Sequence, residues 1–322
     1  MLIVKQFLSF EEAKDIWESL ERQTFHYPFQ TYAYQKLFTK NFSQMDNIFL
    51  LGVFDNKIPI ALGTFEKIGT TIVFLGMKHV LGKEEVTDFG DILIADTYHT
   101  QAKEIWNVLL NFLSKYAQQI QLDYVREDSI TYQVLQKRNT QSLVQKVSPF
   151  LSLPISWDDY LSSLVRKDRH ELKRKMKRLN DVSWQFVQNT NTPQVFSDFI
   201  RLHRLSDSAK EHFMSQSMEN FFHDLSQADF GFWKVGFASL FAEKTIAAIV
   251  MYFFNTSHIL LYNSGFDPKY KSLSVGIVSK ALFIRESIIQ HYKTFDFLRG
   301  DERYKYDLGA KDQKLFKISL DI

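Results

Sequence analysis

Apolar side chains recur along the first half of the chain at two spacings. Alternating positions and short runs such as Ile48–Phe54 predict strands, whereas spacings of three and four residues predict helices. Ser9, with Glu12 three residues on, forms a capping box that marks a helix start. The pattern predicts strands at 1–7, 48–54, 59–65, 71–75, 92–95 and 121–125, helices at 10–22, 32–39, 98–117 and 131–137, and an irregular segment at 78–90.

The second half opens at Ser148-Pro149 and continues the mixture of helix and strand patterns. Its first element is a long amphipathic helix predicted over 157–180, because apolar residues there recur every three or four positions, at Leu161, Val165, Leu172, Met176 and Leu179. The rest predicts helices at 193–205, 218–228 and 273–291 and strands at 182–187, 231–240, 245–254, 258–265, 294–298 and 315–320.

Two stretches of the first half recur in the second, in the same order. The turn at 54–61, Phe-Asp-Asn-Lys-Ile-Pro-Ile-Ala, matches 241–248, Phe-Ala-Glu-Lys-Thr-Ile-Ala-Ala. Residues 122–128, Leu-Asp-Tyr-Val-Arg-Glu-Asp, match 295–301, Phe-Asp-Phe-Leu-Arg-Gly-Asp. A chain of 322 residues suits two domains. We therefore predict a duplicated α/β fold with a mixed sheet in each copy, one over 1–147 and one over 148–322.

Composition and motifs exclude several function classes. The chain has no cysteine, which rules out disulfides, thiolate metal sites and a cysteine nucleophile. The histidines His170 and His203 stand alone, with no convincing metal-ligand spacing, and no Gly-x-Ser-x-Gly or Walker sequence occurs, so we set aside metalloenzymes, hydrolases and kinases. The longest apolar run, 246–254, is shorter than the ~20 residues that a membrane helix needs. We expect a cytoplasmic protein without a membrane span.

Positive charge is concentrated in one predicted helix. The net charge is +2, yet Arg166–Arg178 contains eight Lys or Arg and two acids, a local balance of +6. This helix is either a solvated face whose apolar stripe packs inward or an anion-binding surface, with Arg169, Lys173 and Arg174 meeting a diphosphate or the end of a tRNA. DNA binding is not expected, because no nucleic-acid motif accompanies the helix.

The loop 265–272 joins a strand to a helix that begins with small residues. Such a helix start exposes unpaired backbone N–H groups and the positive end of the helix dipole, which together bind phosphate groups. Lys269 and Lys271 would reinforce the site. An ordinary polar loop before a helix is the alternative.

Three stretches resemble one known family. Residues 148–164, leading into 169–179, resemble the middle of the GNAT-like acetyltransferases associated with cellulose and exopolysaccharide biosynthesis, the CelD type. The block 295–310 resembles the most distinctive segment of that family, and the hairpin around 242–245 also fits. The family is related in fold to the Fem peptidoglycan-bridge transferases, so the resemblance implies a tandem GNAT fold with a degenerate first copy. Leu308 departs from the family, whose members usually have tryptophan or another bulky residue near it.

The resemblance also implies a donor site. GNAT enzymes bind the pyrophosphate of coenzyme A through the pattern Arg/Gln-x-x-Gly-x-Gly/Ala, to which Lys271-x-x-Ser274-x-Gly276 is similar. An acyl-CoA is then a co-substrate, and no tightly bound cofactor or metal is expected. The donor-binding residues would be Lys271, Ser272, Ser274, Val275 and Gly276.

The segment after the strand 294–298 carries the candidate catalytic groups. Asp301 and Glu302 could accept a proton from the attacking amine, Tyr304 or Tyr306 could protonate the leaving group, and Lys305 could stabilise an oxyanion or hold a phosphate. Asp296 and Arg299 have counterparts in Asp123 and Arg126 and are expected to form a structural cluster. Tyr262, on the preceding strand, is a candidate acceptor contact.

Three functions remain open at this point. The first is an acyl-CoA-dependent N-acyltransferase acting on a small amine or a cell-envelope or exopolysaccharide precursor. The second is a Fem-like transferase with aminoacyl-tRNA as donor. The third is a non-catalytic module that binds anionic glycan precursors. The pattern of residues names neither the acceptor nor an oligomeric state.

Overall fold

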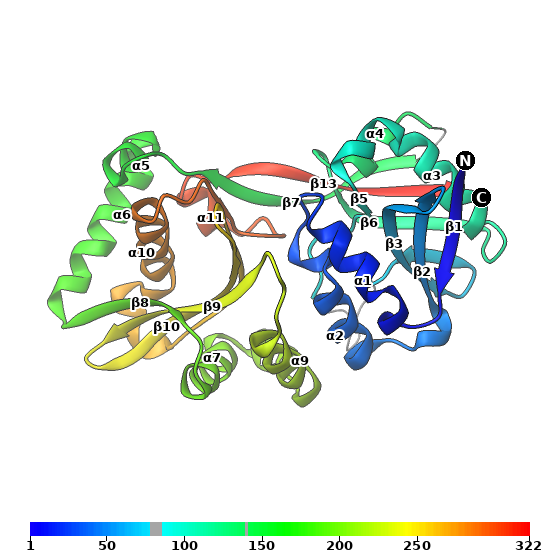
Figure 1. The fold of residues 1–322 in the computed structure, drawn as a ribbon. Helices are drawn as coiled ribbons and strands as arrows, with labels where there is room; N and C mark the ends of the chain where they lie inside the picture. The colour runs from blue at the N-terminus through cyan, green and yellow to red at the C-terminus, as the bar shows by residue number, and fades with distance from the viewer. Residues whose placement is uncertain (78–85, 139–140) are drawn as a thin grey trace. The chain divides into compact units, whose positions relative to one another are not determined.

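A computed structural model of the chain describes residues 1–77, 86–138 and 141–322, so part of the predicted irregular segment 78–90 lies outside the described residues. The chain forms two compact units (Figure 1). The first unit contains residues 1–147 and 313–322, and the second contains 148–312. The predicted boundary 148–322 is therefore wrong at its end, because the last strand hydrogen-bonds to a strand of the first unit, with Leu315 opposite Arg126 and Leu320 opposite Ile120.

The first unit is built on one mixed sheet, in the order β1-β2-β3-β4-β6-β13, with β5 paired to β3. Its strands are β1 (Leu2–Phe7), β2 (Ile48–Asp55), β3 (Ile58–Ile68), β4 (Thr71–Phe74), β5 (Leu93–Ile94), β6 (Gln119–Arg126) and β13 (Lys311–Asp321). Its helices are α1 (Phe10–Glu21), α2 (Tyr32–Phe42), α3 (Ala102–Leu113) and α4 (Ile130–Leu135).

Helices cover both faces of the first sheet. Adjacent residues of a strand point to opposite faces. On β3, the hydroxyl of Thr64 donates to Gln35 of α2, whereas the ring of Phe65 packs against Trp106 of α3, with ring centroids 6.3 Å apart. Ser9 caps α1 as predicted, since its hydroxyl accepts from the Glu12 amide; among these described residues the reciprocal bond of a capping box is absent, because the Glu12 carboxylate accepts from the Leu8 amide and not from the Ser9 amide.

The second unit has a sheet in the order β7-β12-β11-β10-β9-β8. Its strands are β7 (Gln141–Ser152, which enters this unit at Ser148), β8 (Trp184–Thr190), β9 (Lys234–Ala242), β10 (Thr245–Phe254), β11 (His258–Phe266) and β12 (Thr294–Asp296). Its helices are α5 (Trp157–Ser163), α6 (Arg166–Arg178), α7 (Pro193–Ser206), α8 (Ser208–Phe213), α9 (Gln216–Gln227), α10 (Val275–Ile289) and α11 (Arg303–Asp307).

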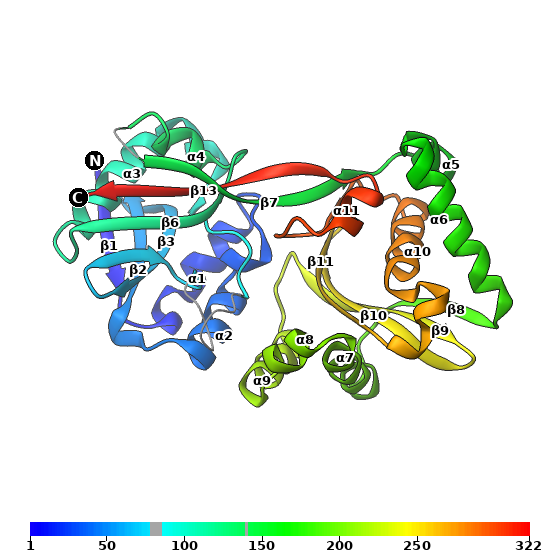
Figure 2. The same cartoon turned by 180° about the vertical axis from the view of Figure 1, so that it is seen from behind.

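The second sheet also lies between two helical layers, with α6 and α10 on one side and α7 and α9 on the other (Figures 1 and 2). On β10, the ring of Tyr252 packs against Phe283 of α10, at 4.5 Å between centroids. The next residue, Phe253, contacts Tyr262, which in turn contacts Phe222 of α9. The predicted mixed α/β architecture is confirmed in both units.

The long helix predicted over 157–180 is two helices. Leu164 and Val165 between α5 and α6 have extended backbones. The extended Leu164 places its side chain in the core against Gly309, where an added Cβ would come within 2.6 Å of it, while Val165 remains 65% exposed. An apolar spacing of three and four residues continues through such a break, which is why the sequence pattern did not reveal it.

Candidate functional site

Two neighbouring parallel strands of the second unit separate after a short pairing. Only His258, Ile259 and Leu260 of β11 pair with β12, opposite Thr294–Asp296. Beyond this point β11 continues to Phe266, whereas the chain after Asp296 turns into a loop and then α11. The opening between diverging parallel strands lies at their carboxyl ends, where ligands of α/β sheets bind.

The first turn of α10 follows β11 and has unpaired amides. Ser274, the residue before the helix, is left-handed (φ 55°, ψ 35°), and its side chain does not cap the helix. Among the residues that the structure describes, no acceptor is hydrogen-bonded to the N–H groups of Val275 and Gly276. These amides and the helix dipole favour an anion at this turn. The predicted Lys271 and Ser272 are exposed and precede the turn.

Lys280 lies one turn further along α10 and was not predicted from the sequence. Its side chain is buried, and its Nζ donates to the carbonyl of Gly276 at 2.9 Å and lies 5.0 Å from the ring centroid of Tyr304. Burial, followed by the charge of Lys210, lowers the pKa of Lys280 to about 7, although Glu302 acts in the opposite direction. The signal in the sequence was a single charged residue in the stretch Val275–Ile284.

Lys305 holds the loop that follows β12. Its side chain is only 2% exposed, and its Nζ donates to the carbonyls of Leu298, Arg299 and Gly300 at 2.9, 3.1 and 3.0 Å. The Glu302 carboxylate is also 2.9 Å away. An ammonium group has three protons, so these acceptors leave none for an oxyanion or a phosphate. The structure therefore corrects the predicted role: Lys305 is a positioning residue for the loop.

The other predicted residues of this segment differ in their accessibility. Glu302 is 58% exposed and lies over Gly300, whose added Cβ would be 2.6 Å from a Glu302 oxygen. The hydroxyl of Tyr304 has no hydrogen bond to any described residue, and burial raises its pKa. The hydroxyl of Tyr306 donates to Asp312 at 2.8 Å, and Asp301 is exposed near Tyr306. Of the two tyrosines, Tyr304 is the one available to a ligand.

A further lysine reaches the site from the opposite helical layer. Lys210 of α8 donates to the carbonyl of Ser264 on β11, and burial lowers its pKa. The charges of Lys210, Glu302 and Lys305 all influence the pKa of Lys280, although α8 follows α7 on one face of the sheet and α10 covers the other. Their proximity is explained by the opening between β11 and β12. We call Lys210, Lys280, Lys305 and Glu302 the lysine cluster; its charge favours an anion.

His203 is a core histidine. It is 1% exposed, and burial, then Lys210, lowers its pKa to about 3, so the imidazole is neutral at physiological pH. Among the described residues, no group of three or more His, Asp or Glu is arranged to hold a metal ion.

The predicted substrate contacts on α6 are not brought into the lysine cluster. Arg174 pairs with Glu171 through two hydrogen bonds of 2.6 and 2.8 Å, and Arg169 donates to Ser162, while Lys173 is exposed. A hollow of about 320 Å³ beside α6 is lined instead by residues on a different face of this helix and by Ile277 and α11: Lys167, Asp168, Glu171, Leu172, Lys175, Ile277, Arg303 and Asp307. Tyr262 belongs to the aromatic layer with Phe222 and Phe253.

The acidic residue of the repeated heptad has a structural environment in both units. Asp296 is 2% exposed and accepts from the Ser148 hydroxyl and the Leu298 amide, both at 2.8 Å. Asp123 accepts from Gln121 and Gln145, both at 2.9 Å. Leu308 also lies in the core, where its carbonyl accepts from the buried Tyr160 hydroxyl.

Comparison with known proteins shows what the chain is similar to. Residues 166–306, most of the second unit, match the family described as the acetyltransferase (GNAT) domain. The whole chain superposes on FemX with 10% identity, a TM-score of 0.60 and coverage of 99% of this chain and 96% of that one. A tandem GNAT protein from the clavulanic acid biosynthesis pathway matches with 9% identity, a TM-score of 0.51 and coverage of 100% and 98%.

A third solved structure has a different described role. It is the C-terminal domain of a putative lysylphosphatidylglycerol synthetase from Agrobacterium fabrum, with 9% identity, a TM-score of 0.59 and coverage of 97% and 92%. No curated protein matches the sequence significantly. At these identities the superpositions establish the fold. Residues 166–306 are thus similar to the GNAT acetyltransferase domain, and the fold of the chain is similar to that of tandem GNAT and Fem-type proteins.

No helix among the described residues has the length and apolar character needed to cross a bilayer.

Proposed function

We propose that the second unit is an N-acyltransferase that moves an acyl group from an acyl-CoA to an amine. The observation that carries the proposal is the opening between β11 and β12, where the unpaired amides of Val275 and Gly276 adjoin the lysine cluster. An acyl-CoA suits this arrangement, because its pyrophosphate would bind at the first turn of α10 and its thioester would lie in the opening between β11 and β12. An acyl-CoA donor would place the reaction in the cytoplasm.

The pyrophosphate of the donor would bind at the first turn of α10. The amides of Val275 and Gly276 donate to it, and Lys280 and Lys210 supply positive charge. Lys280 has a pKa of about 7 in the free protein, because burial disfavours its charged form. An anion beside it stabilises the ammonium form, so donor binding above neutral pH should be accompanied by proton uptake.

The transfer step requires a proton acceptor and a proton donor. The amine nitrogen attacks the thioester carbonyl carbon, and the carbon–sulfur bond breaks as the tetrahedral intermediate collapses. Glu302 is the accessible carboxylate of the site and accepts the proton that the amine loses. Tyr304, whose hydroxyl is not bonded to a described residue, donates a proton to the leaving thiolate. No covalent intermediate on the protein is needed.

The acceptor that we favour is an amino sugar or another amine of a cell-envelope or exopolysaccharide precursor. The support for it is the resemblance of 148–179 and 295–310 to CelD-type acetyltransferases. A second donor, aminoacyl-tRNA, is favoured by the exposed basic residues on α6, among them Lys173, Lys177 and Arg178.

The assay measures thiol release from a panel of acetyl-CoA and longer acyl-CoAs with candidate amines, using a thiol-reactive dye. Because the chain contains no cysteine, the protein adds no background signal. Glu302→Gln and Tyr304→Phe should lower kcat, whereas Lys280→Met should mainly weaken donor binding. Lys293→Met, at an exposed lysine of the same unit, is the control and should have no effect.

Calorimetry tests the donor site separately from turnover. In buffers of different ionisation enthalpy at pH about 8, acetyl-CoA binding should take up a fraction of a proton in the wild type and none in Lys280→Met. If no acyl-CoA stabilises or binds the protein at millimolar concentration, the acyl-CoA donor is excluded. The same binding measurements are then made with aminoacyl-tRNA and UDP-sugars. Binding of a UDP-sugar without any turnover would favour a binding module.

A further inference from the structure

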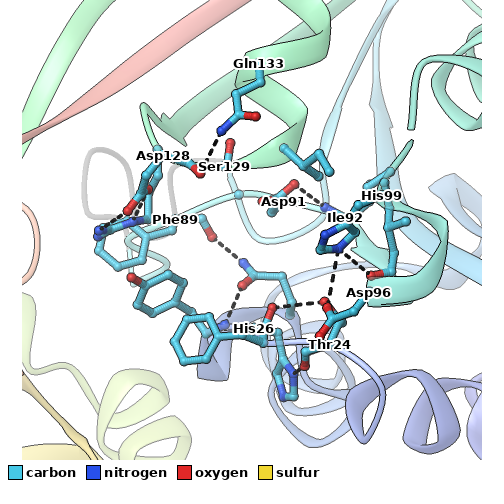
Figure 3. Close-up of a pocket in the computed structure, with 17 residues that line it drawn as sticks. Thr24, His26, Phe89, Asp91, Ile92, Asp96, His99, Asp128, Ser129 and Gln133 are labelled. Carbon is cyan, nitrogen blue, oxygen red and sulfur yellow. Dashed lines mark hydrogen bonds and ion pairs between the residues drawn. The ribbon is translucent and has the colours of Figure 1, made fainter. Parts of the chain in front are cut away.

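The first unit has a cavity of about 320 Å³ at the carboxyl end of β6 (Figure 3). Its walls come from the loop after α1, the segment before β5, the turn that leads into α3, and the residues that follow β6. Lining residues include Phe25, His26, Tyr27, Asp91, Asp96, His99, Arg126, Asp128 and Gln133. The volume lies within the range of small-molecule sites, which is about 300–1,000 Å³.

The cavity occupies the place in its own fold unit where the second unit has the lysine cluster. β4 and β6 are parallel and pair only at Thr71–Ile72, as β11 and β12 pair only briefly. In the first unit, however, the opening is filled: the Gly90 amide donates to Tyr124 of β6, and an added Cβ on Gly90 would be 2.4 Å from Phe74. Gly90 thus occupies the opening that a thioester would need, and its neighbours Phe89, Asp91 and Ile92 line the cavity.

Arg126, the one arginine in the wall, is held by the protein itself. Its guanidinium carbon lies 4.7 Å from the centre of the Tyr27 ring and 4.8 Å from that of Phe89. It also donates to both carboxylate oxygens of Asp128, at 3.0 and 3.2 Å. Stacked and paired in this way, Arg126 has its charge compensated and is not presented to an anionic ligand.

Asp91 has one oxygen committed and one available. Both the hydroxyl of Thr131 and the amide of Ile92 donate to its Oδ1. Its Oδ2 accepts no hydrogen bond from any described residue, and the side chain lines the cavity (Figure 3). Burial raises the pKa of Asp91 to about 6, and the neighbouring Asp128 acts in the same direction while Arg126 opposes it. At neutral pH Asp91 is therefore an incompletely solvated carboxylate.

The remaining titratable groups leave the cavity with a negative balance. His26 donates its Nδ1–H to the Thr24 carbonyl, and burial lowers its pKa, so it is neutral. His99 donates to the Ile94 carbonyl at 3.2 Å and lies 3.4 Å from Asp96. Three carboxylates, those of Asp91, Asp96 and Asp128, thus line the cavity together with one arginine.

We propose that this cavity binds a small molecule carrying a primary ammonium or guanidinium group, which donates to Asp91 Oδ2. The aromatic rings at the mouth suit such a ligand, since Phe25 is half exposed and its ring meets Tyr27 edge to face at 5.4 Å. The cavity of the first unit then binds a cation, whereas the lysine cluster of the second unit favours an anion. The proposal does not depend on transferase activity.

Binding is tested on the full-length protein with three probes of similar length and different charge: putrescine, 1,4-butanediol and succinate. Ligand-observed NMR or calorimetry at millimolar concentration should detect putrescine but neither the diol nor the diacid. Asp91→Asn keeps an oxygen for Thr131 and Ile92, so it should fold, and it should weaken putrescine binding by about tenfold or more. Asp46→Asn removes the same charge at an exposed position of the first unit and should bind as the wild type does.

Lowering the pH from about 7.5 to about 5 should also weaken binding, because it protonates Asp91. The proposal is overturned if the diamine does not bind, if the diol binds equally well, or if Asp91→Asn leaves putrescine binding unchanged. Since none of these measurements uses an acyl donor, a failure here is distinguishable from a failure of the proposed transferase reaction.

Discussion

Replacing Lys305 with methionine separates a structural role from a catalytic one. Methionine matches the length of the lysine stem but cannot donate hydrogen bonds. The three carbonyls of Leu298, Arg299 and Gly300 would lose their common donor, and the Glu302 carboxylate would lose its counter-ion. The loop after β12 therefore loses the group that determines its path.

The size of the effect follows from the burial of these groups. Leu298 is 2% exposed, so its carbonyl cannot turn to solvent without opening the loop, whereas Glu302 is largely exposed and its ion pair contributes little. Leaving buried acceptors unpaired by removing a charged donor costs about 3–5 kcal/mol. For a unit of this size, such a loss lowers the unfolding temperature by on the order of 10 °C.

Thermal unfolding of the full-length protein measures this loss, and Lys311→Met, at an exposed lysine, is the matched control. Glu302→Gln should lower the unfolding temperature by far less than Lys305→Met. If Lys305→Met unfolds at the wild-type temperature yet abolishes transfer, the hydrogen bonds described here do not hold the loop, and Lys305 acts in the chemistry.

Three further substitutions have expected outcomes. Burial lowers the pKa of Lys280 to about 7, so between that pH and the ordinary lysine pKa the unfolded chain holds a proton that the native protein lacks. The free energy of unfolding, relative to that of Lys280→Met, should therefore rise by up to ~1.4 kcal/mol per pH unit. Urea unfolding from pH about 7 to 10 that showed no such rise would contradict the assignment. Gly265→Ala should prevent correct packing of α7 on β11, because an added Cβ would be 2.3 Å from the His203 amide nitrogen; a native-like circular dichroism spectrum and unfolding temperature would refute this. Ser274→Gly should stabilise the protein by up to about 1 kcal/mol, since glycine adopts the left-handed conformation without a steric cost, and a lower unfolding temperature would show that the serine side chain contributes something else.

Local patterns predicted most elements, since each depends on a few adjacent residues. The hairpins of both units, the N-cap at Ser9 and the strand β10 at 245–254 follow from alternation, capping chemistry and turn residues. The pairing of β13 with β6 did not follow, because the alternating pattern of a strand does not specify which of two sheets it joins.

The sequence singled out segments that contribute to the candidate site but not all of the residues in it. Glu302, Tyr304 and the helix start at 274–276 belong to segments that the sequence singled out. Lys280 and Lys210 were missed because each stands in a helix without a motif, and only the three-dimensional fold shows that their charges interact. Lys305 was misassigned for a related reason: a lysine beside an acid suggests catalysis in the sequence, while its three carbonyl acceptors come from a loop conformation that the sequence does not show.

The return of β13 to the first unit has a consequence for biosynthesis. Because 148–312 form a compact unit of their own, that unit is complete in sequence before residues 313–321 leave the ribosome. Residues 1–147 of the first unit are made before the second unit, yet the edge of β6 that pairs with β13 stays uncovered until the intervening segment has been translated. Unpaired strand edges of this kind bind chaperones and other nascent chains. The first unit is therefore expected to complete its fold after the second unit.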